Sequence, residues 1–307
     1  MVFKKMLQKF GVGGPSVDTV LADPRVQPGG QLSGEVRLTG GEADSEIEHI
    51  ALSLVVRSAR SGSAEFHRAV VCGATRLTAK EQRVVSFTIP MPWETPLTDV
   101  GGQPLPGIVL GLRTELSIAK AVDKGDLDPV IVTPLASQDA VLDAFGELGF
   151  HFKSTELEGG QLYGVRQELP FYQEIEFHPP SRYAGRIAEV ELSFVADREG
   201  VQVVLVADKR GGFGASPVGR FGVGHDEAVD TDWARLIGEW LDEVANSRQA
   251  HHGYGHHDGY DDDEYGHRGQ RRGMGMGGVV AGAAVGVVGG MMIGEMLDGD
   301  DGGGDEG

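Results

Sequence analysis

The feature that most constrains how this chain folds is an alternation of apolar and polar side chains with a period of two, which dominates residues 17–122. Small or apolar residues occupy every second position of Leu32–Leu38 and again of Ile50–Val56. The longest such run, Ile108–Ile118, places Arg113 and Glu115 opposite its apolar residues. Because successive side chains of a strand point to opposite faces, each run predicts a half-buried β-strand. Closely spaced strands with Gly and Pro turns and no helix between them are typical of an antiparallel β-sandwich.

The second half of the chain returns to strand-like runs after a break rich in charged residues at 123–129, where we place the domain boundary. Apolar residues at helical spacing predict a short helix after this break, capped by Ser137 and ended by Gly149, and a longer amphipathic helix over Asp232–Val244. The runs between the two helices predict a second sandwich; they are Phe150–Leu157, Phe171–Phe177, Val190–Ala196, Val201–Ala207 and Val218–Val223.

These patterns together predict an all-β fold class, with two consecutive antiparallel β-sandwich domains, short helices and a glycine-rich C-terminal tail. Residues 1–10 carry apolar side chains at helical spacing with Lys4, Lys5 and Lys9 opposite, which predicts an amphipathic helix that packs on its own domain or contacts a membrane. The expected segments are this helix at 1–13, the sandwiches at 14–124 and 125–250, a linker rich in His, Asp and Gly at 251–272, and a glycine-zipper segment with an acidic tail at 273–307.

Several short motifs carry a resemblance to a known family. The first sandwich opens with Val17-Asp18-Thr19-Val20-Leu21, and Pro28-Gly29-Gly30 is followed by Gly34-Glu35-Val36. The second half carries Val141-Leu142-Asp143-Ala144 and the run Pro170–Phe177. In this combination, which covers about residues 1–245, the chain resembles the bacterial sporulation-control (SpoOM-like) family. The resemblance implies two arrestin-like β-sandwich domains in a cytoplasmic regulatory or adaptor protein that influences sporulation and cell development, with no assigned enzymatic activity.

Charge and motifs exclude several functional classes. The formal net charge is −19, from 46 acidic and 27 basic side chains, so the electrostatic field repels phosphate backbones and we expect no nucleic-acid partner. The single cysteine, Cys72, and the lack of a secretory signal indicate a cytoplasmic protein. The motifs of serine hydrolases, P-loop enzymes and zinc proteases are missing, so we predict neither catalytic residues nor a cofactor. The glycine-rich Gly212–Gly214 and Gly222–Gly224 are interpreted as hairpin turns.

The tail begins with a histidine tract, in which five of the ten histidines lie within 17 residues. Imidazoles at this density chelate zinc or nickel, and the candidate metal ligands are His251, His252, His256, His257 and His267. Gly and Asp hold no fixed geometry, however, and ordering them around a metal costs about 1 kcal/mol or more per residue. A solvated spacer is therefore the alternative to a weak metal site.

An uncharged run of 22 residues, Gly273–Gly294, follows. As a helix it would be about 33 Å long, against about 30 Å for the hydrocarbon core of a bilayer. A glycine at every fourth position lets two helix backbones approach closely, and these candidate self-association residues are Gly278, Gly282, Gly286, Gly290 and Gly294. Because glycine is a poor helix former, three alternatives stay open: a glycine zipper that self-associates in or on a membrane, a single membrane span, and a low-complexity tail.

Our leading functional interpretation is a non-enzymatic adaptor that presents sheet edges, loops and domain faces to protein partners. The reason is that the sequence predicts a two-domain β scaffold but contains no recognisable set of catalytic residues. The alternative is a membrane-associated, self-assembling structural protein, in which the glycine zipper forms homo-oligomers. A metal-dependent hydrolase that uses the histidine tract ranks third, because a catalytic metal needs rigid ligands on structured elements.

Replacing both Gly282 and Gly286 by Leu tests the glycine zipper. Larger side chains hold two helix backbones apart while they raise the hydrophobicity of the run, so we expect oligomers to fall to monomers while membrane association persists or increases. Crosslinking of the wild-type and double-Leu chains in membrane fractions measures both effects. Unchanged oligomers in the double-Leu chain would contradict the zipper.

Overall fold

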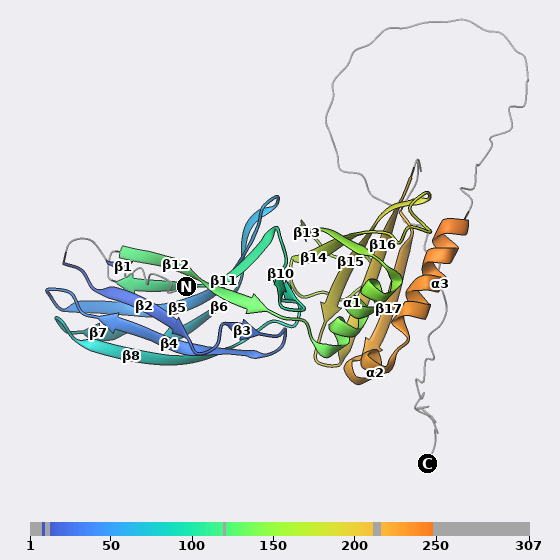
Figure 1. Ribbon diagram of the computed structural model, residues 1–307. Coiled ribbons are helices and arrows are strands. Elements are labelled where there is room, and N and C mark those ends of the chain that lie inside the picture. Colours follow the sequence, from blue (N-terminus) through green and yellow to red (C-terminus); the bar gives the residue numbers. More distant parts are fainter. Residues whose placement is uncertain (1–7, 10–12, 119–120, 211–215, 248–307) are drawn as a thin grey trace, which may run out of the picture.

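The first domain packs two mostly antiparallel sheets face to face (Figure 1). The computed structural model describes residues 8–9, 13–118, 121–210 and 216–247. One sheet has the strand order β1-β2-β4-β8, with β1 Gln8–Lys9, β2 Ser16–Leu21, β4 Gln31–Thr39 and β8 Gln82–Pro90. The other has the order β3-β12-β11-β5-β6, with β3 Arg25–Val26, β12 Ala121–Val132, β11 Ile108–Ile118, β5 Ser45–Ser58 and β6 Gly62–Cys72. The short strand β7, Thr75–Leu77, pairs with β5, and β9 Asp99–Val100 pairs with β10 Gln103–Pro104.

The alternation in the sequence places one face of each long strand between the two sheets. In β4, Leu32, Val36 and Leu38 are at most 1% exposed. On the facing sheet, Leu52 and Leu54 of β5 are fully buried. Burial of one such side chain contributes about 1.5–3 kcal/mol, and a slip of one residue would turn this whole set toward solvent. The period of the sequence therefore sets the strand register.

The second domain is built on a single five-stranded antiparallel sheet with helices on one face (Figure 1). Its strands follow one another in chain order as β13 His151–Gly159, β14 Phe171–His178, β15 Ile187–Ala196, β16 Gly200–Lys209 and β17 Val218–Gly224. The helices are α1 Ala136–Leu148, α2 His225–Asp230 and α3 Trp233–Asn246. As the spacing predicts, α3 buries one apolar face, which contains Trp233, Ile237, Trp240, Leu241 and Val244.

The predicted class, mostly β with antiparallel sheets and a few short helices, is confirmed. The second domain differs from the expected sandwich in one respect, because among the described residues helices rather than a second sheet cover its five strands. Alternation in a strand shows that one face is buried. It does not show whether a sheet or a helix covers that face.

The predicted domain boundary at 124/125 is wrong. Residues 123–129 belong to β12, where the backbone of Asp123 pairs with Leu116 and that of Lys124 with Glu115. Their charges and glycine are typical of a linker, but β11 supplies the backbone partners that keep this segment in the sheet. The first domain therefore extends to Val132, and α1 begins four residues later at Ala136.

Two local predictions are corrected as well. Gln8 and Lys9 form β1 and pair with β2, so they do not continue an amphipathic helix over 1–13, whose residues 1–7 and 10–12 lie outside the described part. Sheet pairing prevails here because three isolated helical turns are only marginally stable. Gly222–Gly224 form the end of β17 and lead directly into α2 rather than forming a hairpin turn. Gly212–Gly214 lie outside the described residues.

Helix α1 ends at the predicted residue but begins differently. Gly149 adopts the left-handed conformation, with φ of 85°, and its N–H reaches the last carbonyls of the helix. Ser137, the predicted cap, lies inside the first turn. The side chain of Gln138 instead accepts the N–H of Leu135, at 2.9 Å, which satisfies one donor at the start of the helix.

Gly146 of α1 and Gly149, which caps it, provide a matched stability test, because a methyl group at either position would meet nothing within 4 Å. Gly149→Ala should destabilise the protein by about 1 kcal/mol, since alanine strains the left-handed conformation. Gly146→Ala should stabilise it by about 0.5–1 kcal/mol, since alanine is the better helix former. Urea unfolding of both variants measures the difference. Changes of the same sign in the free energy of unfolding would contradict this account.

Candidate functional site

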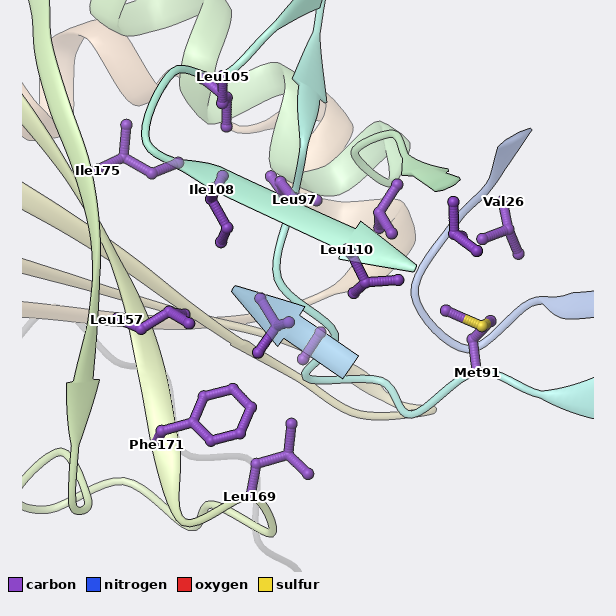
Figure 2. Close-up of a cluster of buried hydrophobic side chains, with 14 of the residues drawn as sticks. Val26, Met91, Leu97, Leu105, Ile108, Leu110, Leu157, Leu169, Phe171 and Ile175 are labelled. Atoms are coloured by element: carbon purple, nitrogen blue, oxygen red, sulfur yellow. The ribbon is translucent and has the colours of Figure 1, made fainter. Parts of the chain in front are cut away.

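Apolar side chains of both domains form one continuous cluster where the domains meet (Figure 2). Leu97, Leu105 and Ile108 of the first domain face Leu157 and Phe171 of the second. All five are at most 9% exposed. Because this contact is as buried as the interior of either domain, the two domains form a single packed unit rather than two loosely linked ones.

Buried polar groups pair across this junction. Gln173 of β14 donates from Nε2 to the carbonyl of Leu97 and accepts the N–H of Leu97 at Oε1, both at 2.8 Å. The carboxylate of Glu94 accepts the N–H groups of Glu168 and Leu169 at 2.6 and 2.7 Å. Burial raises the pKa of Glu94, although these two donors act in the opposite direction. Fully paired polar groups in an apolar setting fix one relative placement of the domains.

The loop between β5 and β6 covers the outer edge of β13. The hydroxyl of Ser61 donates to the carbonyl of Leu157 at 2.6 Å, and Arg60 forms an ion pair with Glu156. Gly107 also approaches this strand, since a Cβ there would lie 3.0 Å from the carbonyl oxygen of Thr155. An uncovered strand edge is a template for pairing with another chain. The first domain therefore closes one edge of the second sheet.

A serine and a histidine also meet beside the junction. Nδ1 of His225 lies 2.8 Å from the hydroxyl of Ser137, and Nε2 lies 2.8 Å from the carbonyl oxygen of Asp197. The ring stacks on Trp93, with 5.6 Å between the ring centroids. A neutral imidazole that carries its proton on Nε2 satisfies both hydrogen bonds. Because Ser137 is only 2% exposed, this pair joins α1 to α2 and offers no accessible nucleophile.

The face of the second sheet that the helices leave open is acidic. Strand pairing sets Glu156 opposite Glu174, and Glu176 opposite Glu191. Because side chains alternate along each strand, these carboxylates share one face. We call this surface the acidic face; it contains Glu156, Glu158, Glu174, Glu176, Glu189, Glu191 and Asp208.

The acidic face is not among the sites predicted above, although the sequence contains a signal for it. Glutamate alternates with one apolar residue in Glu156-Leu157-Glu158, in Glu174-Ile175-Glu176 and in Glu189-Val190-Glu191. In three strands that pair in sequence order, this alternation predicts a row of carboxylates on one face.

Burial and mutual repulsion disfavour the charged form of two carboxylates at the centre of this face. The pKa of Glu174 rises to about 8, first because the group is buried and then because Glu191 and Glu158 lie near it. The pKa of Glu191 rises to about 7, again through burial first and through Asp208 next. Burial also raises the pKa of the neighbouring Tyr172 to about 12. At neutral pH the centre of the face is therefore partly protonated.

Two basic side chains offset part of the remaining charge, Arg60 at Glu156 and Lys153 at two further carboxylates. Lys153 bonds to Glu176 at 2.7 Å and also to Glu189, and both carboxylates raise its pKa. Burial alone would raise the pKa of Glu176, but its hydrogen bonds to Lys153 and Ser154 outweigh burial and lower it. Among the described residues, ion pairs therefore lie at the periphery of the face, whereas Glu174 at its centre bonds to the side chain of Tyr172 rather than to a cation.

Within the described part of the chain, one group of side chains could hold a metal ion. Oxygens of Glu189, Glu191 and Asp208 all lie within 4.8 Å of one another. Three carboxylates suit a hard cation such as Ca²⁺ or Mg²⁺. Lys153 already bonds to Glu189, and the hydroxyl of Ser216 donates to Asp208 at 2.7 Å, so two of the three ligands are engaged within the protein. The fit to a cation is therefore poor.

The first sandwich leaves one long, regular edge strand open among the described residues. Strand β8 pairs with β4 over nine successive residues and with no other strand of its sheet. Its core face contains Phe87 and Ile89, and its outward face carries Val84, which is 55% exposed. This edge is a candidate surface for an added strand.

The candidate residues predicted in the tail, the histidine ligands at 251–267 and the zipper glycines at 278–294, lie outside the described residues and stay predictions. Among the helices of the described part, none is long and apolar enough to cross a membrane.

Comparisons with known proteins agree on one family. The family model described as SpoOM protein matches residues 3–211, which end before α2 and α3. The sporulation-control protein spo0M of Bacillus subtilis (strain 168) is 31% identical over 216 residues, covering 68% of this chain and 81% of that protein. The crystal structure of Spo0M from Bacillus subtilis superposes with a TM-score of 0.65 at 26% identity, covering 76% of this chain and all of that one.

The acidic face predicts that stability falls as the pH rises. The folded-state pKa values of Glu174 and Glu191 lie above the ordinary 4.5, so their contribution is fully present below about pH 4.5 and is lost as the pH rises through 7–8. Glu174→Gln should therefore stabilise the protein at pH 8.5 by on the order of 1 kcal/mol, allowing for solvent screening, and should add little at pH 5.

Urea unfolding at the two pH values measures this difference. The control is Glu243→Gln on the exposed side of α3, for which we expect no change at either pH. A Glu174→Gln chain that loses stability at pH 8.5 would contradict the unfavourable ionisation of this carboxylate.

Proposed function

The chain belongs to the SpoOM protein family, and from this premise we propose that it is a regulatory protein of sporulation that acts as a non-enzymatic adaptor. A protein partner adds a strand along the edge of β8 and so extends the first sandwich. The observation that carries this proposal is the open, unbulged edge of β8. Main-chain hydrogen bonds along such an edge supply affinity, and the side chains that alternate beside it supply specificity.

The side chains of β8 support this role. Natural edge strands are blunted by charges, prolines or bulges, which prevent unwanted pairing. The outward-facing residues of β8 include Val84, Ser86 and Thr88, which carry no charge, and the pairing with β4 has no register shift. The one charged residue of the strand, Arg83, bonds to Glu81 and to the carbonyl of Arg76. Proline occurs only at the last position, Pro90. An edge that lacks this protection over most of its length is suited to pairing with a partner strand.

The other long edge strands are less suited. Strand β6 changes register twice against β5 and carries the charged residues Glu65 and Arg68. The edge of β13 is covered by Ser61 and Gly107 of the first domain. Strand β17 contains three glycines in seven residues, which weakens a strand because glycine offers no side chain to pack. This comparison favours β8 as the docking edge.

A matched pair of valine substitutions tests the proposal. Val84 on β8 and Val109 on β11 are both 55% exposed, but β11 is an interior strand with neighbours on both sides. Val84→Lys should weaken capture of the partner about tenfold or more, since a lysine on an edge strand disfavours further pairing. Val109→Lys should leave capture unchanged, and both variants should keep their stability within about 0.5 kcal/mol.

The measurement is quantitative affinity capture by the full chain and both variants from sporulating cells, with thermal melting as the folding control. Docking at β8 would be contradicted if both variants lost the partner equally, or if neither variant lost it.

A further inference from the structure

A second surface, on the helical side of the second domain, is also open. A groove of about 450 Å³ runs between α1 on one side and the start of α3 with the preceding turn on the other. Its lining includes Ala140 and Ala144 of α1 and Val229 of α2. Val229 is 52% exposed, which is unusual for a side chain that lies beside a packed helix pair.

Small side chains form the floor of the groove along α1. Ala136, Ala140 and Ala144 recur at every fourth position and all line it. Residues four apart stack on one face of a helix, so these three alanines form a shallow channel. A helix with small residues at the same spacing could approach the backbone of α1 closely, because the ridges of one helix fit between those of the other.

One wall of the groove is negative. Asp139, Asp143 and Glu147 also recur every fourth position, line the groove and are exposed. The pKa of Asp139 is raised, first by partial desolvation of its carboxyl group and then by the neighbouring Asp143. Within the part of the chain that the structure describes, no lysine or arginine lines this groove. Carboxylates spaced in this way attract a segment with basic residues at one end.

We propose that the groove binds residues 268–294 of the same chain. This segment carries Arg268, Arg271 and Arg272 and no acidic residue, and its other positions are mainly Gly, Ala, Val and Met. Its glycines recur at every fourth position from Gly278 to Gly294, which matches the spacing of the alanines in α1. The arginines would face the acidic wall while the glycine stripe packs on the alanine floor.

The length of the chain outside the described part suits this contact. The described residues end at Ser247, directly after α3. Since α3 starts at the groove and its 14 residues rise about 20 Å, Ser247 lies about 20 Å from the groove. A linker of 20 residues leads from there to Arg268, and a glycine-rich linker of that length has an expected end-to-end distance of about 25 Å. A linker that matches the span gives an effective concentration in the millimolar range, so even a weak contact is populated.

Disulfide trapping in the full chain tests the contact. In a Cys72→Ser background, Ala140→Cys and Gly282→Cys place one thiol in the groove and one in the glycine stripe. We expect the intramolecular disulfide to form about tenfold faster than in a control chain with Glu243→Cys and Gly282→Cys. The control is stringent, because Glu243 lies closer along the chain to the linker than the groove does. Equal rates in the two chains would overturn the proposal.

Charge reversal separates this contact from chance collision. Arg268→Glu, Arg271→Glu and Arg272→Glu together should slow trapping about tenfold, and so should Asp139→Lys, Asp143→Lys and Glu147→Lys. Combining all six should restore the rate, which shows that the reversed chains still fold. A rate of disulfide formation that neither charge reversal changes would overturn the charge pairing.

A disulfide that forms mainly between two chains would place a second copy in the groove and would equally overturn the proposal. Sedimentation of the trapped product distinguishes these two cases.

Discussion

The hydrogen bonds between Gln173 and Leu97 are the constraint on which the rest of the structure depends. They satisfy the buried N–H and carbonyl of Leu97 in the middle of an apolar contact between two domains. Loss of the amide would leave both groups of Leu97 buried without partners, at a cost of about 1–3 kcal/mol each. Apolar contact alone tolerates sliding, whereas this pairing has one geometry. The domains are therefore held in a single relative placement.

That placement decides which surfaces are closed and which stay open. The first domain covers the edge of β13. It also covers part of the sheet face on which the helices pack, because Leu97 and Ile108 lie there. It leaves free the β8 edge, the groove beside α1 and most of the acidic face, to which it contributes Arg60. Since the domains do not move independently, these three surfaces keep a fixed relation to one another, as a platform for simultaneous contacts requires.

The strands were predictable because their signal is local, whereas the junction depends on contacts between distant residues. Alternation located β4, β5, β11 and the five strands of the second sheet. The charged segment at 123–129 misled the boundary prediction, since its place in β12 depends on backbone partners in β11 rather than on its own composition. Gln173 and Leu97 are 76 residues apart, and no pattern near either one indicates the other. The acidic face could have been predicted from its alternating glutamates.

The second domain concentrates carboxyl groups on two opposite sides, and the two sides differ in how strongly they attract a cation. On the acidic face, burial raises the pKa of Glu174 to about 8 and that of Glu191 to about 7, so the centre holds protons near neutral pH and its field weakens. The carboxylates of Asp143 and Glu147 beside the groove stand exposed to water instead. An approaching arginine loses less hydration at an exposed wall than in a buried cluster. Electrostatic recruitment of a basic segment therefore favours the groove, while the acidic face mainly makes stability depend on pH.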